Sequence, residues 1–210
     1  MSVQRFILAM AAALTLAFAG VAGAQSNADL APDVLARNIT DEVLQVLRAD
    51  KDIQSGNMKK AIALVETKVL PHFDFTRMTQ LAMGRNWRDT TPEQKKALTQ
   101  EFRDLLVRTY TVALTQYRNQ TVDYKPLKLN PGETEVVVRS QINNPGAAPI
   151  SVDYAMSKAP NGWKVFDIAV ENVSLVQNYR TTFNTEVQKS GVDGLIKVLA
   201  DRNKALAARQ

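Results

Sequence analysis

The sequence predicts an α+β domain in which helices pack on one face of a curved antiparallel sheet of about four strands. Three observations support this prediction. Apolar residues recur at helical spacing between residues 33 and 117, the period changes to two between residues 121 and 171, and helical spacing returns from residue 174 onward. Runs of helices on either side of a run of strands are typical of the α+β class.

The first 24 residues have the organisation of a secretory signal peptide. Arg5 is the only charge, Phe6–Ala19 is apolar, and Ala22-Gly23-Ala24 is a small-residue cleavage motif. An apolar stretch of 14 residues is short for a membrane span, and an uncleaved anchor helix is the alternative. We therefore expect cleavage after Ala24, a single domain over Gln25–Gln210, and localisation in the periplasm.

Composition narrows the classes of partner. The chain has no cysteine, which excludes a disulfide framework and thiol chemistry. One of the 26 basic residues, Arg5, lies in the signal segment, so the mature chain has 25 basic and 21 acidic residues and a net charge of +4. This charge suits anionic lipid headgroups or an acidic protein surface, and it also suits an ordinary solvated surface. Because no basic run has interleaved aromatics, no nucleic-acid partner is expected.

Six helices are predicted. They are Asp33–Ala49, Asn57–Leu70, Asp74–Met83, a long helix from Pro92 whose apolar stripe reaches Tyr117, Ser174–Gln188 and Asp193–Ala208. The long helix has the clearest start, because Thr91 caps it, Pro92 takes its first position and Gln94 completes a capping box. The last two helices are separated near Gly191.

Four strands separated by turn signals are predicted in the middle of the chain. They are Thr121–Leu129, Glu133–Ile142, Ile150–Ser157 and Trp163–Glu171. The short connections imply an antiparallel meander. Pro126 places the first strand at an edge of the sheet. Strict alternation in the fourth strand places Phe166 and Ile168 on one face and Val165 on the other.

The residues for most catalytic chemistries are missing. His72 is the only histidine, and the sequence has neither a G-x-S-x-G motif, nor zinc ligands at the usual spacing, nor a calcium-binding loop. Asp167 is the one acid in a strongly apolar strand, where it is either a perturbed carboxylate in a pocket or a residue that faces solvent or pairs with Arg180. We expect no enzymatic activity, no metal and no cofactor. An enzyme on a cone-shaped α+β scaffold, with Asp167 or His72 as base, is one alternative.

Two blocks of sequence, Leu70–Tyr110 and Trp163–Leu199, resemble the MlaC family of periplasmic phospholipid-binding proteins, which are also known as toluene-tolerance auxiliary components of an ABC transport system. The family usually reads V-E-G-V-S-L-V where this chain has Asn172 in place of the glycine. Because Asn tolerates left-handed backbone, we expect the same bend at Asn172.

The resemblance implies a deep apolar cavity for acyl tails with the headgroup facing solvent. It implies a carrier that shuttles phospholipid between outer-membrane and inner-membrane complexes and so maintains outer-membrane lipid asymmetry. The implied partners are phospholipid as cargo, an inner-membrane ABC complex with an MCE-domain ring and an outer-membrane lipoprotein–porin complex. The carrier is expected to be a monomer. A non-catalytic adaptor of an ABC transporter, with a solid core, is the other alternative.

The apolar side chains of the predicted sheet face and helices are the candidate lipid-binding residues, and ordinary core packing is the alternative for each. They are Phe73, Phe75, Met78, Leu81, Trp87, Phe102, Leu106, Tyr110, Leu114, Val136, Val138, Val152, Tyr154, Phe166, Ile168 and Val170. Arg85, Arg139 and Arg180 are candidate contacts for the phosphate at the rim, with surface ion pairs as the alternative.

Overall fold

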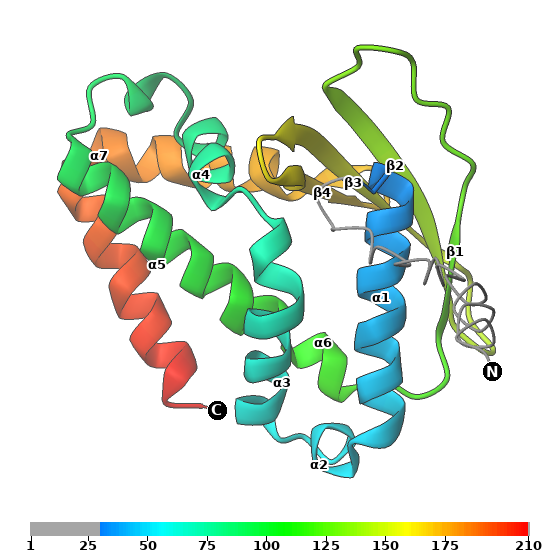
Figure 1. The fold of residues 1–210 in the computed structure, drawn as a ribbon. Coiled ribbons are helices and arrows are strands. Elements are labelled where there is room, and N and C mark those ends of the chain that lie inside the picture. Colours follow the sequence, from blue (N-terminus) through cyan, green and yellow to red (C-terminus); the bar gives the residue numbers. More distant parts are fainter. Residues whose placement is uncertain (1–29, 210) are drawn as a thin grey trace, which may run out of the picture.

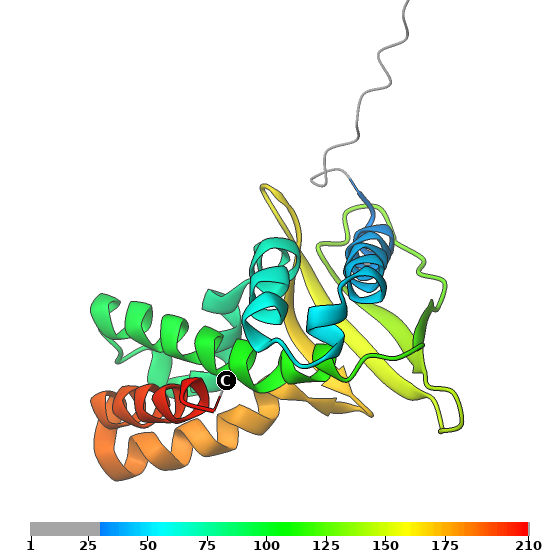
Figure 2. The ribbon, with the colours of Figure 1, turned by 90° about the horizontal axis from the view of Figure 1, so that it is seen from below.

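A five-stranded antiparallel sheet and two groups of helices make up residues 30–209, which are the part of the chain that the computed structural model describes (Figure 1). Helix α1 (Pro32–Ala49) lies against the sheet, whereas α4 (Phe75–Met83), α5 (Pro92–Tyr110) and α7 (Leu175–Ala207) form a separate group (Figure 2). The predicted α+β class is confirmed, with five strands in place of four. Within residues 30–209, no helix is long and apolar enough to cross a membrane. The predicted signal peptide lies outside the described residues.

The strands follow one another in the sheet in their sequence order. They are β1 (Thr121–Tyr124), β2 (Glu135–Asn143), β3 (Ile150–Ala159), β4 (Gly162–Val170) and β5 (Val173–Ser174). β1 is an edge strand, as predicted, but it ends at Tyr124 instead of Leu129. The Lys125 amide still donates to the Arg139 carbonyl at 2.9 Å, and Pro126 then has no N–H to continue the ladder.

A β-bulge in β4 overturns the predicted faces of that strand. Met156 of β3 pairs with Val165 and Ala155 pairs with Asp167, so Phe166 has no partner in the ladder. A single extra residue reverses the alternation of every residue beyond it. Val165 and Ile168 therefore share the inner face, and Phe166 lies instead beside Val137 of the outer face.

A tight left-handed turn connects β4 to β5. Glu171 and Asn172 have φ angles of 49° and 64°, so the bend expected at the position of the family's glycine is present. The Ser174 hydroxyl then caps α7 by accepting from the Gln177 amide at 3.1 Å. The turn thus converts the last long strand into a helix within a few residues.

The predicted helices are present, but two of them are divided differently. The second continues from α3 (Met58–Leu64) through a π-helical turn, η2 (Val65–Val69), into the 3₁₀ turn η3 (Leu70–His72). The long helix stops at Tyr110 and is followed by the short helix α6 (Val112–Thr115). The two predicted C-terminal helices are the arms of α7, which turns at Gly191 with φ of 73°. Short turns α2 (Lys51–Gln54) and η4 (Gly84–Trp87) complete the helical elements of the described chain.

The capping box predicted for α5 is confirmed. The backbone N–H of Gln94 donates to Thr91 Oγ1 at 3.2 Å, and the backbone N–H of Thr91 donates to Gln94 Oε1 at 3.1 Å. Gln94 Nε2 also donates to Asp193 Oδ1 at 2.7 Å, so the start of α5 is bonded to the second arm of α7. Local capping and tertiary packing therefore fix the same end of the helix.

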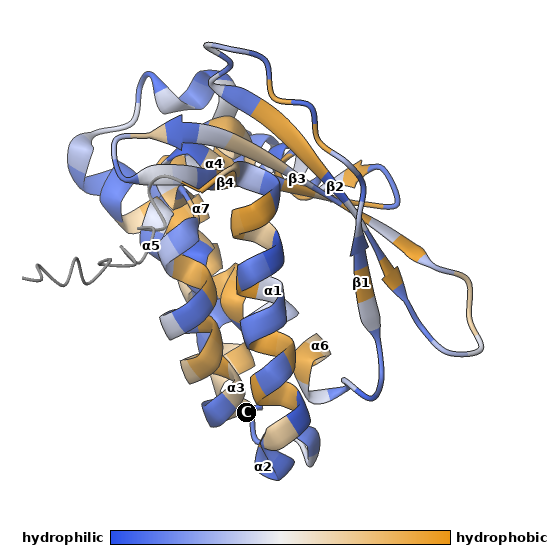
Figure 3. Ribbon diagram, turned by 45° about the vertical axis from the view of Figure 1, so that its right-hand side comes forward, coloured by the Kyte–Doolittle hydropathy of each residue, from blue (hydrophilic) through white to orange (hydrophobic). Residues whose placement is uncertain are grey.

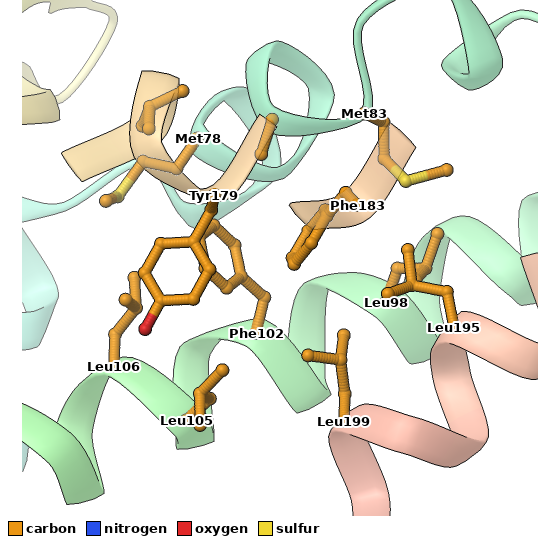
Figure 4. Packing of buried hydrophobic residues seen from close by; sticks show 12 residues of the cluster. Met78, Met83, Leu98, Phe102, Leu105, Leu106, Tyr179, Phe183, Leu195 and Leu199 are labelled. Atoms are coloured by element: carbon orange, nitrogen blue, oxygen red, sulfur yellow. The ribbon is translucent and has the colours of Figure 1, made fainter. Parts of the chain in front are cut away.

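The helical group has a packed aromatic core. The Phe102 ring of α5 meets the rings of Tyr179 and Phe183 of α7 edge to face, at centroid distances of 4.9 and 5.0 Å (Figure 4). Met78, Leu98 and Leu105 close the cluster and are almost fully buried. This group is filled by its own side chains, so the internal space lies elsewhere in the molecule.

Candidate ligand-binding site

The first internal space lies beside α1. This α1 pocket has a volume of about 390 Å³, and α1 lines it with one stripe at helical spacing: Ala36, Ile39, Thr40, Val43, Leu44 and Leu47. The sheet contributes Val122, Ile142, Tyr154, Met156, Val165 and Ile168. Val69, His72, Phe73, Ala113, Leu114, Tyr117 and Gln120 complete the wall. The apolar face of α1 is therefore only partly used for packing on the sheet, and the rest faces this pocket.

A second space lies beside α5. This α5 pocket has a volume of about 620 Å³. Its wall comes from η2, the end of α5, and the inner face of β3 and β4, through residues that include Val65, Leu106, Tyr110, Val152 and Val170. η2 contributes Val65 and Val69, which are four residues apart and lie on one side of the turn, and π-helical turns are frequent at functional sites.

The two pockets are neighbours with a common wall. Six residues belong to both: Val43, Val69, Phe73, Leu114, Ile142 and Ile168. Apolar residues, orange in Figure 3, gather on α1, α6 and the sheet around this region. Each volume is within the range of about 300 to 1,000 Å³ that is usual for small-molecule sites.

The walls contain no Asp, Glu, Lys or Arg side chain among the residues that the structure describes. A charged ligand group would lose its hydration there without a countercharge to replace it, whereas hydrocarbon would gain from leaving water. The site is therefore suited to an apolar, chain-like ligand, and polar parts of that ligand must lie at an opening.

Exposed apolar side chains surround one opening of the α5 pocket. Tyr110, Val170 and Val173 line this pocket and are 47, 46 and 62% exposed. They come from the end of α5 and from the β4–β5 turn, so the left-handed turn at Asn172 positions part of this rim.

Hydrogen bonds hold α1 in place beside its pocket. The Tyr124 hydroxyl lies 2.6 Å from Thr40 Oγ1 and donates to the Ala36 carbonyl at 3.1 Å. At the other end, Arg48 Nε donates to the Tyr117 hydroxyl at 3.0 Å. Burial raises the pKa of Tyr124 and of Tyr154, so both phenols stay protonated at neutral pH.

The two candidate catalytic residues, Asp167 and His72, have different surroundings. Asp167 accepts from the amides of Ile168 and Val176, at 2.8 and 3.0 Å, and from the Ser174 hydroxyl. It therefore joins β4 to the start of α7. Asp167 is partly buried, lines neither pocket, and makes no ion pair with Arg180 within residues 30–209. His72 lines the α1 pocket, and burial lowers its pKa, with the Lys164 charge acting in the same direction and Glu42 opposing it. Residues 30–209 contain no cluster of three or more potential metal ligands.

The structure divides the sixteen predicted lipid-binding residues into two groups of equal size. Those in the pocket walls are Phe73, Leu106, Tyr110, Leu114, Val152, Tyr154, Ile168 and Val170. Those that line neither pocket are Phe75, Met78, Leu81, Trp87, Phe102, Val136, Val138 and Phe166. The second group packs in the helical core or between α1 and the sheet, where helical or alternating spacing looks the same as in a pocket wall.

The three predicted rim arginines lie away from both pockets. Arg139 faces Asp153 of β3, with Nε 3.7 Å from the carboxylate. Arg180 packs on Gly84, where an added Cβ would come within 3.0 Å of its Nε. Arg85 belongs to η4 in the helical group. None of the three lines the described openings, so their contact with phosphate remains a prediction without geometric support.

Sequence reasoning missed the contribution of α1 and η2. The i, i+4, i+8 spacing of Ile39, Val43 and Leu47 indicated an apolar helix face, but spacing does not distinguish packing against a sheet from lining a cavity. The π turn at Val65–Val69 has no such signal in the sequence.

The fold and the site define a class of α+β binding proteins that enclose an apolar cavity between a sheet and helices. A family model described as "MlaC protein" matches residues 37–201, and the chain belongs to the MlaC family. It is 26% identical over 163 residues to the toluene tolerance protein ttg2D of Pseudomonas putida, covering 77% of this chain and 75% of the relative. It is 24% identical over 172 residues to the intermembrane phospholipid transport system binding protein MlaC of Haemophilus influenzae, covering 80% of each.

A solved structure has the same fold. The phospholipid-binding protein of Ralstonia solanacearum, determined in complex with a phospholipid, is 43% identical and superposes with a TM-score of 0.78. The match covers 83% of this chain and 98% of that protein.

Proposed function

We propose that this chain binds phospholipid with its acyl chains in the α1 and α5 pockets. The observation that carries the proposal is the pair of adjoining pockets without charged walls, of about 390 and 620 Å³. Family membership and the phospholipid-bound relative support the identity of the ligand. The eight predicted residues in the pocket walls are the proposed acyl-chain contacts.

The energetics of transfer explain why such a protein needs a cavity. Moving one methylene from hydrocarbon to water costs about 0.8 kcal/mol, so about 30 methylenes of a two-chain lipid oppose free passage by more than about 20 kcal/mol. A carrier lowers this barrier by surrounding the chains with apolar side chains. The phosphate-bearing head stays at an opening, where water solvates it.

We further propose that the mature protein works in the periplasm as a monomer and without catalysis. It would exchange lipid with an inner-membrane ABC complex bearing an MCE-domain ring and with an outer-membrane lipoprotein–porin complex, and so maintain outer-membrane lipid asymmetry. The signal-peptide pattern of residues 1–24 and the relatives' names support this assignment. The adaptor alternative predicts a solid core, and the two pockets disfavour it.

The test is lipid content. Native mass spectrometry and solvent extraction of the purified mature protein should detect bound phospholipid, and protein stripped of lipid should take it up from vesicles. Protein that carries no lipid and takes up none would contradict the proposal. Binding of each candidate partner should be measured separately, with and without lipid loaded.

A further inference from the structure

The seam between α1 and η2 has a polar pocket on its outer side. This seam pocket has a volume of about 210 Å³ and is lined by Leu35, Asn38, Ile39, Glu42, Thr67, Lys68 and His72. Ile39 and His72 also line the α1 pocket, so the polar space adjoins the apolar one. A polar head beside an apolar chain is the arrangement that an amphiphile requires.

The polar lining of the seam pocket includes one cation, Lys68, one anion, Glu42, and the side chains of Asn38 and His72. Lys68 Nζ lies 2.9 Å from Glu42 Oε2, and these side chains are 47 and 56% exposed. Within residues 30–209, neither the Asn38 amide nor the His72 ring makes a hydrogen bond to another protein group. All of these groups are donors or acceptors that can bond to a ligand.

We propose that the seam pocket binds a zwitterionic phosphoethanolamine head whose hydrocarbon chain lies in the α1 pocket. This proposal rests on the lipid-binding function proposed above and names a headgroup for it. The phosphate accepts from Lys68, from the Asn38 amide and from an N–H of His72. The ammonium group of the head donates to Glu42.

Glu42 makes the site discriminate between heads. A phosphate that takes Lys68 away from Glu42 leaves the carboxylate beside a second negative charge. An ethanolamine head brings its own ammonium to replace Lys68, whereas a phosphoglycerol head brings only neutral hydroxyls. Because both side chains are about half exposed, water screens the interaction, and the expected preference is about two- to fivefold.

Single-chain lipids test the proposal. Mature protein stripped of lipid is titrated with lysophosphatidylethanolamine and lysophosphatidylglycerol of equal chain length, with calorimetry to give each Kd. The wild type should favour the ethanolamine lipid about two- to fivefold. Glu42→Gln should remove the preference, and Lys68→Gln should weaken binding of both lipids. Asp201→Asn is the matched control, since Asp201 forms an exposed ion pair with Lys197 on α7 and lines neither pocket.

Three results would overturn the proposal: equal affinities in the wild type, a preference that survives in Glu42→Gln, or the same change in Asp201→Asn. Phosphoethanolamine without a chain should show no measurable binding. If it binds as well as the lysolipid, the pocket is a site for free phosphate esters and the proposal is wrong. Uptake of diacyl phospholipid from vesicles is measured on the same samples. Normal uptake with no dependence on Glu42 or Lys68 refutes this inference alone, whereas absence of all lipid binding refutes the proposed function as well.

Discussion

Ile168→Trp should distinguish a pocket wall from an ordinary core position. Ile168 lies in the wall common to the α1 and α5 pockets, so an indole at this position projects into space that acyl chains would occupy. If it displaces about four methylene groups, at about 0.8 kcal/mol each, binding loses about 3 kcal/mol, or about a hundredfold in affinity. Overpacking a filled core typically lowers the free energy of unfolding by about 1 to 3 kcal/mol. The free energy of unfolding of Ile168→Trp, measured in urea, should fall by less than this, because the pocket has room for the indole.

Val138→Phe is the matched control on the same face of the sheet. Val138 is fully buried between α1 and the sheet and lines neither pocket. Its enlargement should lower the free energy of unfolding by about 1 to 3 kcal/mol and leave lipid uptake by the folded protein unchanged. Uptake is measured as extracted lipid phosphate after incubation with vesicles, and stability is measured on lipid-free protein. The reasoning is refuted if Ile168→Trp takes up normal amounts of lipid while its stability falls as in Val138→Phe.

Three other substitutions test individual contacts. Asp167→Asn should lower the free energy of unfolding by about 1.5 to 3 kcal/mol, because it weakens charge-assisted bonds to the start of α7, and lipid uptake should not change; lost uptake in folded protein would contradict this. Thr91→Ala should cost about 1 kcal/mol in urea denaturation, and Thr91→Ser, which keeps the hydroxyl, should cost much less. The pKa of His72 is lowered in the folded state, so its contribution to stability is present above the ordinary histidine pKa and is lost as pH falls. His72→Gln should therefore lose less stability than the wild type between pH 7.5 and 5.5, and equal losses would contradict the assignment.

Local signals predicted two of the boundaries in the helical group correctly, whereas the ends of β1 and of the long helix were predicted too late in the sequence. Thr91, Pro92 and Gln94 identified the start of α5, and Gly191 identified the turn within α7, because capping and left-handed backbone depend on residues close in sequence. The left-handed bend at Asn172 was predicted from the glycine that the family usually has at this position, because Asn tolerates such backbone.

Features that depend on packing could not be predicted in this way. Phe166 was assigned to the wrong face because a bulge is decided by how two strands pair and not by the alternation within one strand. Half of the candidate lining residues face the cavity and half face other side chains, since an apolar residue is suited equally to both. The stripe on α1 became informative only once its position opposite Leu114 and Ile168 was known.

The two adjoining pockets also determine how the fold should respond to hydrostatic pressure. Unfolding removes internal voids, so a protein that contains large ones loses more volume when it unfolds and denatures at lower pressure. Hydrocarbon that fills the space would cancel much of this volume change. Resistance to compression should therefore rise with the amount of cargo held, and the pressure midpoint of unfolding becomes a measure of loading that needs no label on the lipid.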